Sequence, residues 1–240
     1  MKTIQFYMTT LAVLTIALLL ADAPLMAQQL RGNGNIQTQD RNVSGFEGIN
    51  VGGGFTVELT QGNKESLRLE AEENLLDNIK TEVRNGVLHI YNEDGVTTKK
   101  GMKAYITIQE LNSMDISGGV KVIGKSPFRS DALKLDLSGA SNVKLDIDTK
   151  EMKADLSGAS KIELVGKADE VDMNLSGASK VEAADLQAKR VKVEASGASK
   201  VKLYATESLD IDASGASFVY YKGSPSITAE TSAAAKVSRF

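Results

Sequence analysis

The chain has 240 residues, 42% of them hydrophobic and 25% charged, with a formal net charge of −3 and no cysteine. The lack of cysteine excludes disulfides, thiolate metal sites and attachment to lipid through an N-terminal cysteine. Acidic and basic residues are interspersed throughout, and this near-neutral mixture argues against electrostatic binding of nucleic acid, which needs a basic face.

Residues 1–27 have the layout of a secretory signal peptide. Lys2 supplies an early positive charge, residues 3–21 carry no charge, and the small residue Ala27 precedes two glutamines. We therefore predict an exported protein that is periplasmic, associated with the outer membrane or secreted. An uncleaved membrane anchor is the alternative, because the uncharged stretch has roughly the 18 residues that a spanning helix needs.

The residues that follow suggest a leader and one domain. Residues 28–42 are rich in Gln, Asn and Gly and poor in apolar side chains, which is typical of a flexible leader. From Val43 onward apolar and polar residues alternate, which predicts strands at 46–51 and 55–60. We predict a single domain over residues 43–240, in which an elaborated N-terminal part (43–113) precedes a repeated part (114–240).

A short helix and a hairpin are predicted in the N-terminal part. Four apolar residues recur at helical spacing within residues 72–83, namely Leu75, Leu76, Ile79 and Val83. Asn85-Gly86 favours a type I′ turn, which would join residues 80–84 to residues 87–91. If that hairpin forms, the helix ends before Lys80.

From Met114 onward the chain repeats one unit. The sequence Ser-Gly-Ala-Ser begins at five positions separated by 19, 19, 20 and 18 residues, namely Ser138, Ser157, Ser176, Ser196 and Ser214. Degenerate copies begin at Ser117 and Ser232. Each unit contains two strictly alternating runs, so each run is predicted to be a strand with one buried face. Because like residues return at the same phase, stacking the units pairs like with like, and this predicts an all-β solenoid of 18–21 residues per coil.

Two charged rows follow from this stacking. Two residues before each corner serine stand Asp115, Asp136, Asp155, Asn174, Glu194, Asp212 and Glu230. Four residues after it stand Lys121, Asn142, Lys161, Lys180, Lys200, Phe218 and Lys236. Like charges about 4.8 Å apart repel each other. Both rows are therefore predicted to face solvent, where water and salt screen them.

The glycine of each copy marks a corner at which the coil bends. Glycine allows backbone angles and close approaches that a side chain forbids. The predicted structural corners are Gly118, Gly139, Gly158, Gly177, Gly197 and Gly215. The neighbouring serine hydroxyls are predicted to bond corner backbone groups or to link one coil to the next. We expect no catalytic role for them, because a catalytic serine is singular and these form ladders.

The N-terminal part carries a family resemblance. The stretch Phe46-Glu47-Gly48-Ile49-Asn50-Val51-Gly52-Gly53-Gly54-Phe55 contains Gly-Ile-Asn followed by a glycine corner. With the downstream Ser-Gly-Ala-Ser-Lys-Val units, it resembles the exported bacterial family described as an auto-transporter adhesin, head GIN domain. The resemblance implies a right-handed parallel β-helix in the envelope of Bacteroidetes-type bacteria, and it brings no catalytic residues. Independently, residues 52–59 align with residues 157–164, so we expect the first coil at 51–60 and a longer excursion between it and Ser117.

These patterns contain no cluster of side chains typical of a catalytic site, so we predict a non-catalytic, adhesin-like envelope or surface binding protein. We expect no catalytic residues, no metal site and no cofactor. The expected partner is a glycan or an envelope or surface protein. His89, the only histidine, alternates with apolar neighbours on a predicted strand and is expected to face solvent.

Three aromatic residues are candidates for ligand binding, because they occupy outward positions near the last coils: Tyr204, Phe218 and Tyr220. Capping of the solenoid or self-association through its end, giving a homo-oligomer or an end-to-end assembly, is the alternative for them. A carbohydrate-active β-helix enzyme is a further alternative, since polysaccharide cleavage uses clustered carboxylates that the acidic row could supply.

Overall fold

The computed structural model describes residues 29–232 and 234–240, so the predicted signal peptide lies outside the described residues. The N-terminal part contains β1 (Leu30–Arg31), β2 (Ile36–Arg41), β3 (Gly48–Gly53), β4 (Phe55–Gln61), β5 (Ser66–Glu72), the 3-10 helix η1 (Glu73–Asn78), β6 (Ile79–Arg84), β7 (Val87–Asn92), β8 (Val96–Thr97) and β9 (Met102–Ile108). The repeated part contains β10 (Ser113–Gly118), β11 (Lys121–Leu137), β12 (Asn142–Leu156), β13 (Lys161–Leu175), β14 (Lys180–Ala195), β15 (Lys200–Ala213), β16 (Phe218–Lys222), β17 (Ser226–Thr231) and β18 (Lys236–Arg239).

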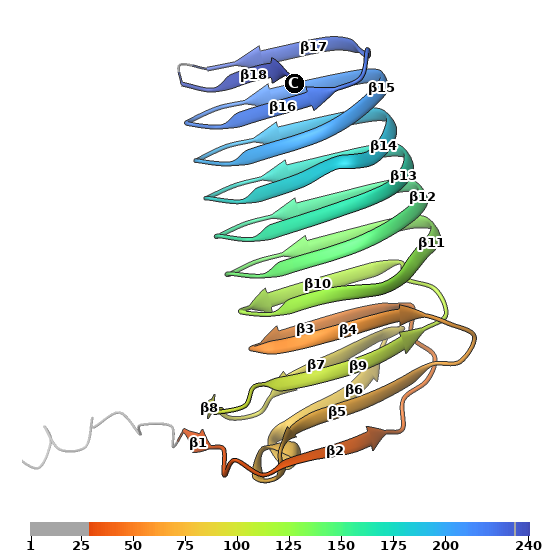
Figure 1. The fold of residues 1–240 in the computed structure, drawn as a ribbon, viewed down its shortest axis with the longest axis vertical. Helices are drawn as coiled ribbons and strands as arrows, with labels where there is room; N and C mark the ends of the chain where they lie inside the picture. The colour runs from red at the N-terminus through yellow and green to blue at the C-terminus, as the bar shows by residue number, and fades with distance from the viewer. Residues whose placement is uncertain (1–28, 233) are drawn as a thin grey trace, which may run out of the picture.

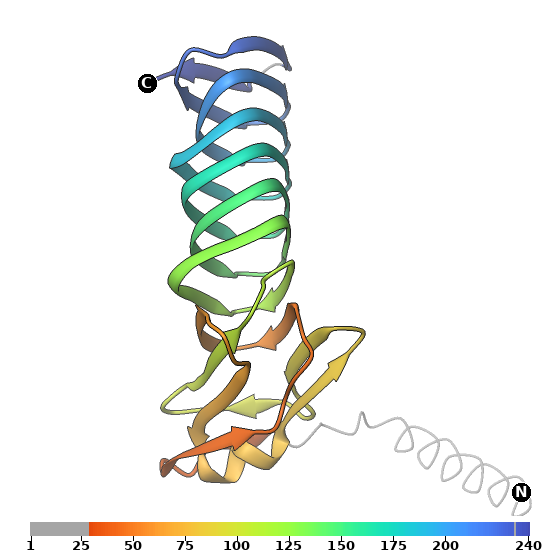
Figure 2. The same ribbon diagram turned by 90° about the vertical axis from the view of Figure 1, so that its right-hand side faces the viewer.

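The predicted parallel β-solenoid is confirmed. Coils stack along one axis from the N-terminal part to β17 and β18 (Figures 1 and 2), and together they make about seven turns. Every pair from β10 to β18 is parallel, in the order β10-β11-β12-β13-β14-β15-β16-β18, with β17 also on β15. One aliphatic position runs through eight layers in register, namely Val57, Val122, Val143, Ile162, Val181, Val201, Val219 and Val237.

Each central coil is one long strand rather than the two strands expected. β12, for example, continues from Asn142 to Leu156 and pairs with β13 at almost every position. The bend opposite the corner is made inside the strand, and register shifts occur there, as between Glu163 and Val165 of β13. Backbone bonds to the coils above and below continue through such a bend. The chain therefore needs a separate turn only at Ser-Gly-Ala-Ser.

The corner geometry explains the glycine and both serines. Gly158 has φ +71°, and a Cβ on it would lie 2.5 Å from the carbonyl oxygen of Gly139 in the coil below. The buried hydroxyl of Ser160 donates to the carbonyl of Ser157 at 2.8 Å and closes the corner. The hydroxyl of Ser196 donates instead to the carbonyl of Leu175, one coil below, at 3.2 Å. Both expected uses of the serine hydroxyls therefore occur.

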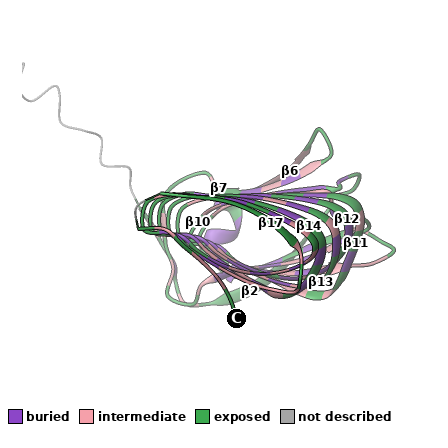
Figure 3. Cartoon of the chain, turned by 90° about the horizontal axis from the view of Figure 1, so that it is seen from above, coloured by how far each residue is buried: buried purple, intermediate pink, exposed green. Residues whose placement is uncertain are grey.

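A single hydrophobic cluster fills the solenoid from Phe46 to Val219. Its members alternate with outward residues along the central strands, such as β12 and β14, so buried and exposed stripes run round the central coils (Figure 3). A fully buried Val, Leu or Ile contributes about 1.5–3 kcal/mol. The aliphatic rows thus provide the main stabilisation of a chain that has no disulfide.

The N-terminal part closes one end of the solenoid. β3 and β4 form the first coil, in parallel with β10 and β11, as the alignment of residues 52–59 with 157–164 predicted. The excursion then returns beneath it, since β7 pairs with β3 and β9 pairs with β4. Beyond them, β2, β5 and β6 form antiparallel pairs, so the coil pattern ends there.

Two expectations for this end need correction. The helix is a short 3-10 helix, and Ile79 and Val83 lie on β6 because the Asn85-Gly86 hairpin, with φ +51° and +75°, extends that strand. Residues 28–42 were expected to be a flexible leader, but they contain β1 and β2. β2 needs few apolar residues because it is an exposed strand held by backbone pairing to β5 and by an ion pair between Asp40 and Arg68.

A buried carboxylate fastens this segment. Glu72 is fully buried and accepts bonds from the Thr98 hydroxyl at 2.7 Å and from the backbone amides of Gly34 and Lys99 at 2.8 and 3.0 Å. The bond from Thr98, followed by the backbone amides, holds the pKa of Glu72 below its usual value despite burial. The charge is thus stabilised by fixed donors from the turn between β1 and β2 and from the loop after β8, and it connects the two segments.

The C-terminal end has no comparable cover. Leu209 and Ile211 of β15 are buried, whereas their partners on β17, Ile227 and Ala229, are exposed. Ile227 is 42% exposed against 1% for Leu209. The inward rows of the last coil therefore continue the core without another coil above them.

Candidate functional site

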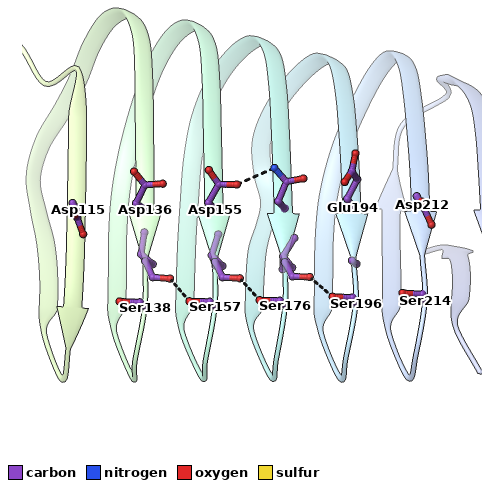
Figure 4. Close-up of a pocket in the computed structure, with 15 residues that line it drawn as sticks. Asp115, Asp136, Ser138, Asp155, Ser157, Ser176, Glu194, Ser196, Asp212 and Ser214 are labelled. Carbon is purple, nitrogen blue, oxygen red and sulfur yellow. Dashed lines mark hydrogen bonds between the residues drawn. The ribbon is translucent and has the colours of Figure 1, made fainter.

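A groove with a volume of about 550 Å³ runs along the wall that leads into the corners. One side is the acidic row, from Asp115 to Asp212, and the other is the row of first corner serines, from Ser138 to Ser214 (Figure 4). Each serine lies two residues after its acidic neighbour, just beyond the end of the strand, so both rows face outward and the backbone between them forms the floor. The outward position of the acidic row agrees with the sequence, but nothing in the sequence indicated a hollow between these rows.

The repulsion within the acidic row is relieved by specific partners. Asn174 interrupts the row and donates its amide to Asp155 at 2.9 Å. Lys134 lies 2.8 Å from Asp136, and Lys192 lies 2.6 Å from Glu194, each pair on a single strand. These exposed pairs contribute little stability individually. Their effect is to reduce the net charge of the groove while its carboxylate oxygens remain along one line.

The N-terminal end of the groove has a distinct electrostatic environment. Burial, with the Asp136 carboxylate as a second cause, raises the pKa of Asp115. Asn50 donates its amide to Asp115 at 2.8 Å, and His89 stands next to Asn50 in the parallel register. His89 was expected to face solvent; it points outward from the sheet but is half-buried at this end of the acidic row.

The three aromatic candidates lie on the other wall, on β15 and β16. Phe218 and Tyr220 have nearly parallel rings, 11° apart with centroids separated by 6.5 Å. The Lys200 ammonium lies 5.5 Å from the Tyr220 ring centroid, and the Lys222 ammonium lies 4.9 Å from that of Tyr204. The structure therefore brings these rings together with lysines, but not with the acidic groove. Phe240 is also exposed, and its backbone amide donates to the Tyr221 carbonyl of β16 at 3.1 Å; the sequence pattern did not predict it as a candidate.

Within residues 29–232 and 234–240, no group of three or more His, Asp or Glu side chains is arranged to hold a metal ion. Over the same residues, no helix has the length and apolar character needed to cross a membrane.

Comparison with solved structures identifies the same fold. A putative adhesin from Bacteroides fragilis superimposes with a TM-score of 0.82 at 23% identity, over 88% of this chain and 100% of that one. A putative lipid binding protein from Parabacteroides distasonis gives 0.73 at 23% identity, over 89% and 100%. A putative adhesin from Parabacteroides merdae gives 0.71 at 20% identity, over 88% and 99%. No curated protein matches the chain.

The family comparison covers most of the solenoid. Residues 45–225 match one family model, from the start of the Gly-Ile-Asn segment to the loop after β16. The predicted resemblance is therefore confirmed. The chain belongs to the family described as "Putative auto-transporter adhesin, head GIN domain".

Proposed function

We propose that this protein is a non-catalytic, adhesin-like binding protein of the cell envelope, exported by residues 1–27, which holds an extended partner along the acidic groove. One observation carries the proposal: the groove presents equivalent carboxylate, amide and hydroxyl oxygens on successive coils. Membership of an adhesin family supports the same role.

The chemistry of the groove limits the kinds of partner that it can bind. Carboxylate and serine oxygens accept or exchange hydrogen bonds with hydroxyl groups, and carboxylates attract cations. The partner is therefore a hydroxyl-rich glycan or a basic segment of an envelope or surface protein. A polyanion is disfavoured in this groove by like-charge repulsion.

The test uses glycan arrays and whole-cell binding with the full chain and two variants. Asp155→Asn with Glu194→Gln removes two groove charges while preserving shape, and Asp148→Asn removes an exposed carboxylate elsewhere. We expect the double variant to bind at least about tenfold more weakly, as for loss of charged contacts at an interface, and Asp148→Asn to bind normally. The proposal would be contradicted if the wild type failed to bind in both assays, or if the two variants lost the same amount of binding affinity.

A carbohydrate-active enzyme is the second candidate, favoured by the Asp115 and Asp136 carboxyls, which are neighbours in the parallel register. Glycoside cleavage uses two carboxyls, and the raised pKa of Asp115 is the direction that suits the general acid. The test is incubation with uronate-rich polysaccharides with and without calcium, with Asp115→Asn as the comparison. Release of sugar by the wild type and not by the variant supports this candidate, and no release in either condition excludes it.

Assembly through the C-terminal end is a structural candidate, favoured by the exposed inward row at Ile227 and Ala229. The other end is closed by antiparallel strands, so contact would join two C-terminal ends about a two-fold axis rather than form a filament.

A further inference from the structure

The outward positions of the last three strand segments on the wall after the corner differ from those of β13 and β14, the two coils before them. These segments are residues 200–204 of β15, 218–222 of β16 and 236–240 at β18, and they are adjacent in the parallel register. We call their outward face the terminal patch. It combines four aromatic rings, Tyr204, Phe218, Tyr220 and Phe240, with four ammonium groups, Lys200, Lys202, Lys222 and Lys236.

Earlier coils show what is unusual here. In β13 and β14, an outward lysine is followed two residues later by a glutamate that pairs with it: Lys161 with Glu163, and Lys180 with Glu182 at 2.6 Å. The position of those glutamates becomes Lys202, Tyr220 and Ser238 in the last three layers. Within the three segments no outward side chain is acidic, so this wall changes from the charge-balanced surface of β13 and β14 to a cationic one.

The lysines of the terminal patch are only partly neutralised. Lys202 lies 3.6 Å from Glu182, and Lys222 lies 3.4 Å from Asp185, both on β14. Among the described residues no carboxylate pairs with Lys200 or Lys236. The ammonium groups of Lys200 and Lys222 lie near the rings of Tyr220 and Tyr204, an arrangement that keeps positive charge beside a ring face.

The rings are placed to form a surface rather than to project from it. Tyr204 and Tyr220 are half-buried, Phe218 is 38% exposed, and only Phe240 is exposed by more than half. Aromatic residues that enter a bilayer bury their apolar area about 5–10 Å deep. Because these rings are already partly covered by the protein, their insertion into a bilayer is disfavoured. Flat rings bordered by ammonium groups suit the apolar face of a sugar ring that carries an anionic substituent.

We infer that the terminal patch is a second binding site, specific for anionic glycans such as those built from uronic acids. The rings pack against sugar faces, and Lys202 and its neighbours donate to carboxylates. This inference deepens the proposed binding function but depends on a different wall from the acidic groove. Opposite charges on the two walls would allow the protein to hold an anionic glycan and a neutral or basic partner together.

The repeat itself supplies conservative variants. Phe218→Lys installs the residue that Lys161, Lys180 and Lys200 carry at the same position, so it removes a ring while adding positive charge. Lys202→Glu installs the residue found at Glu163 and Glu182. Lys144→Glu makes the same charge change on the same wall outside the patch, next to β13, and is the control.

The experiment measures binding of the full chain to hexagalacturonate by calorimetry over a salt series, with maltohexaose and anionic phosphatidylglycerol vesicles as comparison probes. We expect hexagalacturonate binding that weakens with salt, no maltohexaose binding at the patch, and roughly tenfold losses for both Phe218→Lys and Lys202→Glu, as for interface anchors. Lys144→Glu should bind like the wild type.

Four results would overturn the inference: no binding of hexagalacturonate, equal losses in Lys144→Glu and Lys202→Glu, unchanged binding in Phe218→Lys, or binding to vesicles without binding to the oligosaccharide. Circular dichroism of each variant checks that it is folded. If whole cells bind in a manner that needs Asp155 and Glu194 while hexagalacturonate does not bind, only this second site fails and the proposed function stands. If neither binds, both fail.

Discussion

Replacement of the corner glycine by alanine, Gly158→Ala, tests the stacking of the coils most directly. Gly158 has a left-handed backbone, with φ +71°, and an added Cβ would approach the Gly139 carbonyl oxygen to 2.5 Å. That oxygen accepts the Ala159 amide at 2.8 Å, so moving it away weakens the bond between two coils. Real Cβ atoms do not tolerate so short a contact, and the backbone must shift.

Two further glycines separate backbone strain from contact. Gly101 also has positive φ, +81°, but a Cβ there would meet nothing within 4 Å, and Gly54 has neither a positive φ in the left-handed region nor a contact. Left-handed backbone costs an alanine about 1–2 kcal/mol, and overpacking costs about 1–3 kcal/mol more. Alanine at an unstrained glycine stabilises by about 0.4–1 kcal/mol through the unfolded state.

We therefore expect stability to fall in the order Gly54→Ala, wild type, Gly101→Ala, Gly158→Ala. The last should lose about 2–5 kcal/mol when strain and overpacking act together. Because the chain has no tryptophan, urea and thermal unfolding are followed by circular dichroism. A shift of roughly 2–4 °C per kcal/mol is expected for a protein of this size. If Gly158→Ala is no less stable than Gly101→Ala, close stacking of the corners is refuted.

Three further predictions concern the corners, the groove and the solenoid end. Ser160→Ala removes the hydrogen bond to the Ser157 carbonyl and should lower the free energy of unfolding by about 0.5–1.5 kcal/mol. Ser217→Ala should cause no measurable loss, because the buried Ser217 hydroxyl has no partner among the described residues. Equal urea midpoints for the two variants would argue against this corner bond. Asp115→Asn should stabilise the fold by about 0.2–1 kcal/mol at pH 7. The pKa of Asp115 is raised in the folded state, so the wild type loses stability as the pH rises through that pKa and the carboxyl ionises. The gain should therefore vanish at a pH where the wild-type carboxyl is protonated, and a gain that persists in acid would contradict the electrostatic cause. If two C-terminal ends associate, light scattering over a concentration series should show a dimer that Ile227→Lys abolishes, while monomer at every concentration excludes the assembly.

The repeated part could be read from the sequence because its contacts are periodic. Val143, Ile162 and Val181 are 19 residues apart in sequence and adjacent in the structure, so the local pattern also specifies the long-range pairing. The corner glycines and the outward charged rows follow from the same phase. The number of strands per coil did not follow, since alternation does not reveal whether backbone pairing continues through a bend.

The N-terminal part shows the opposite case. β2 has almost no apolar residue, and its strand conformation depends on pairing with β5, about 30 residues later. The helical spacing around Leu75 predicted a helix, but the structure has a 3-10 helix there because the Asn85-Gly86 hairpin places Ile79 on β6. Short-range preferences of this kind are weaker than the pairing of a whole strand.

The sequence by itself determined that this chain stacks like upon like, and therefore its solenoid fold, its corners and the direction in which each row faces. Only the tertiary structure decided which rows border a hollow, which end is closed, and that lysines and aromatic rings from three separate layers form one patch. The physical reason is that periodicity fixes each residue relative to its equivalents, whereas a groove, a closed end and a mixed patch arise from residues that are not equivalent.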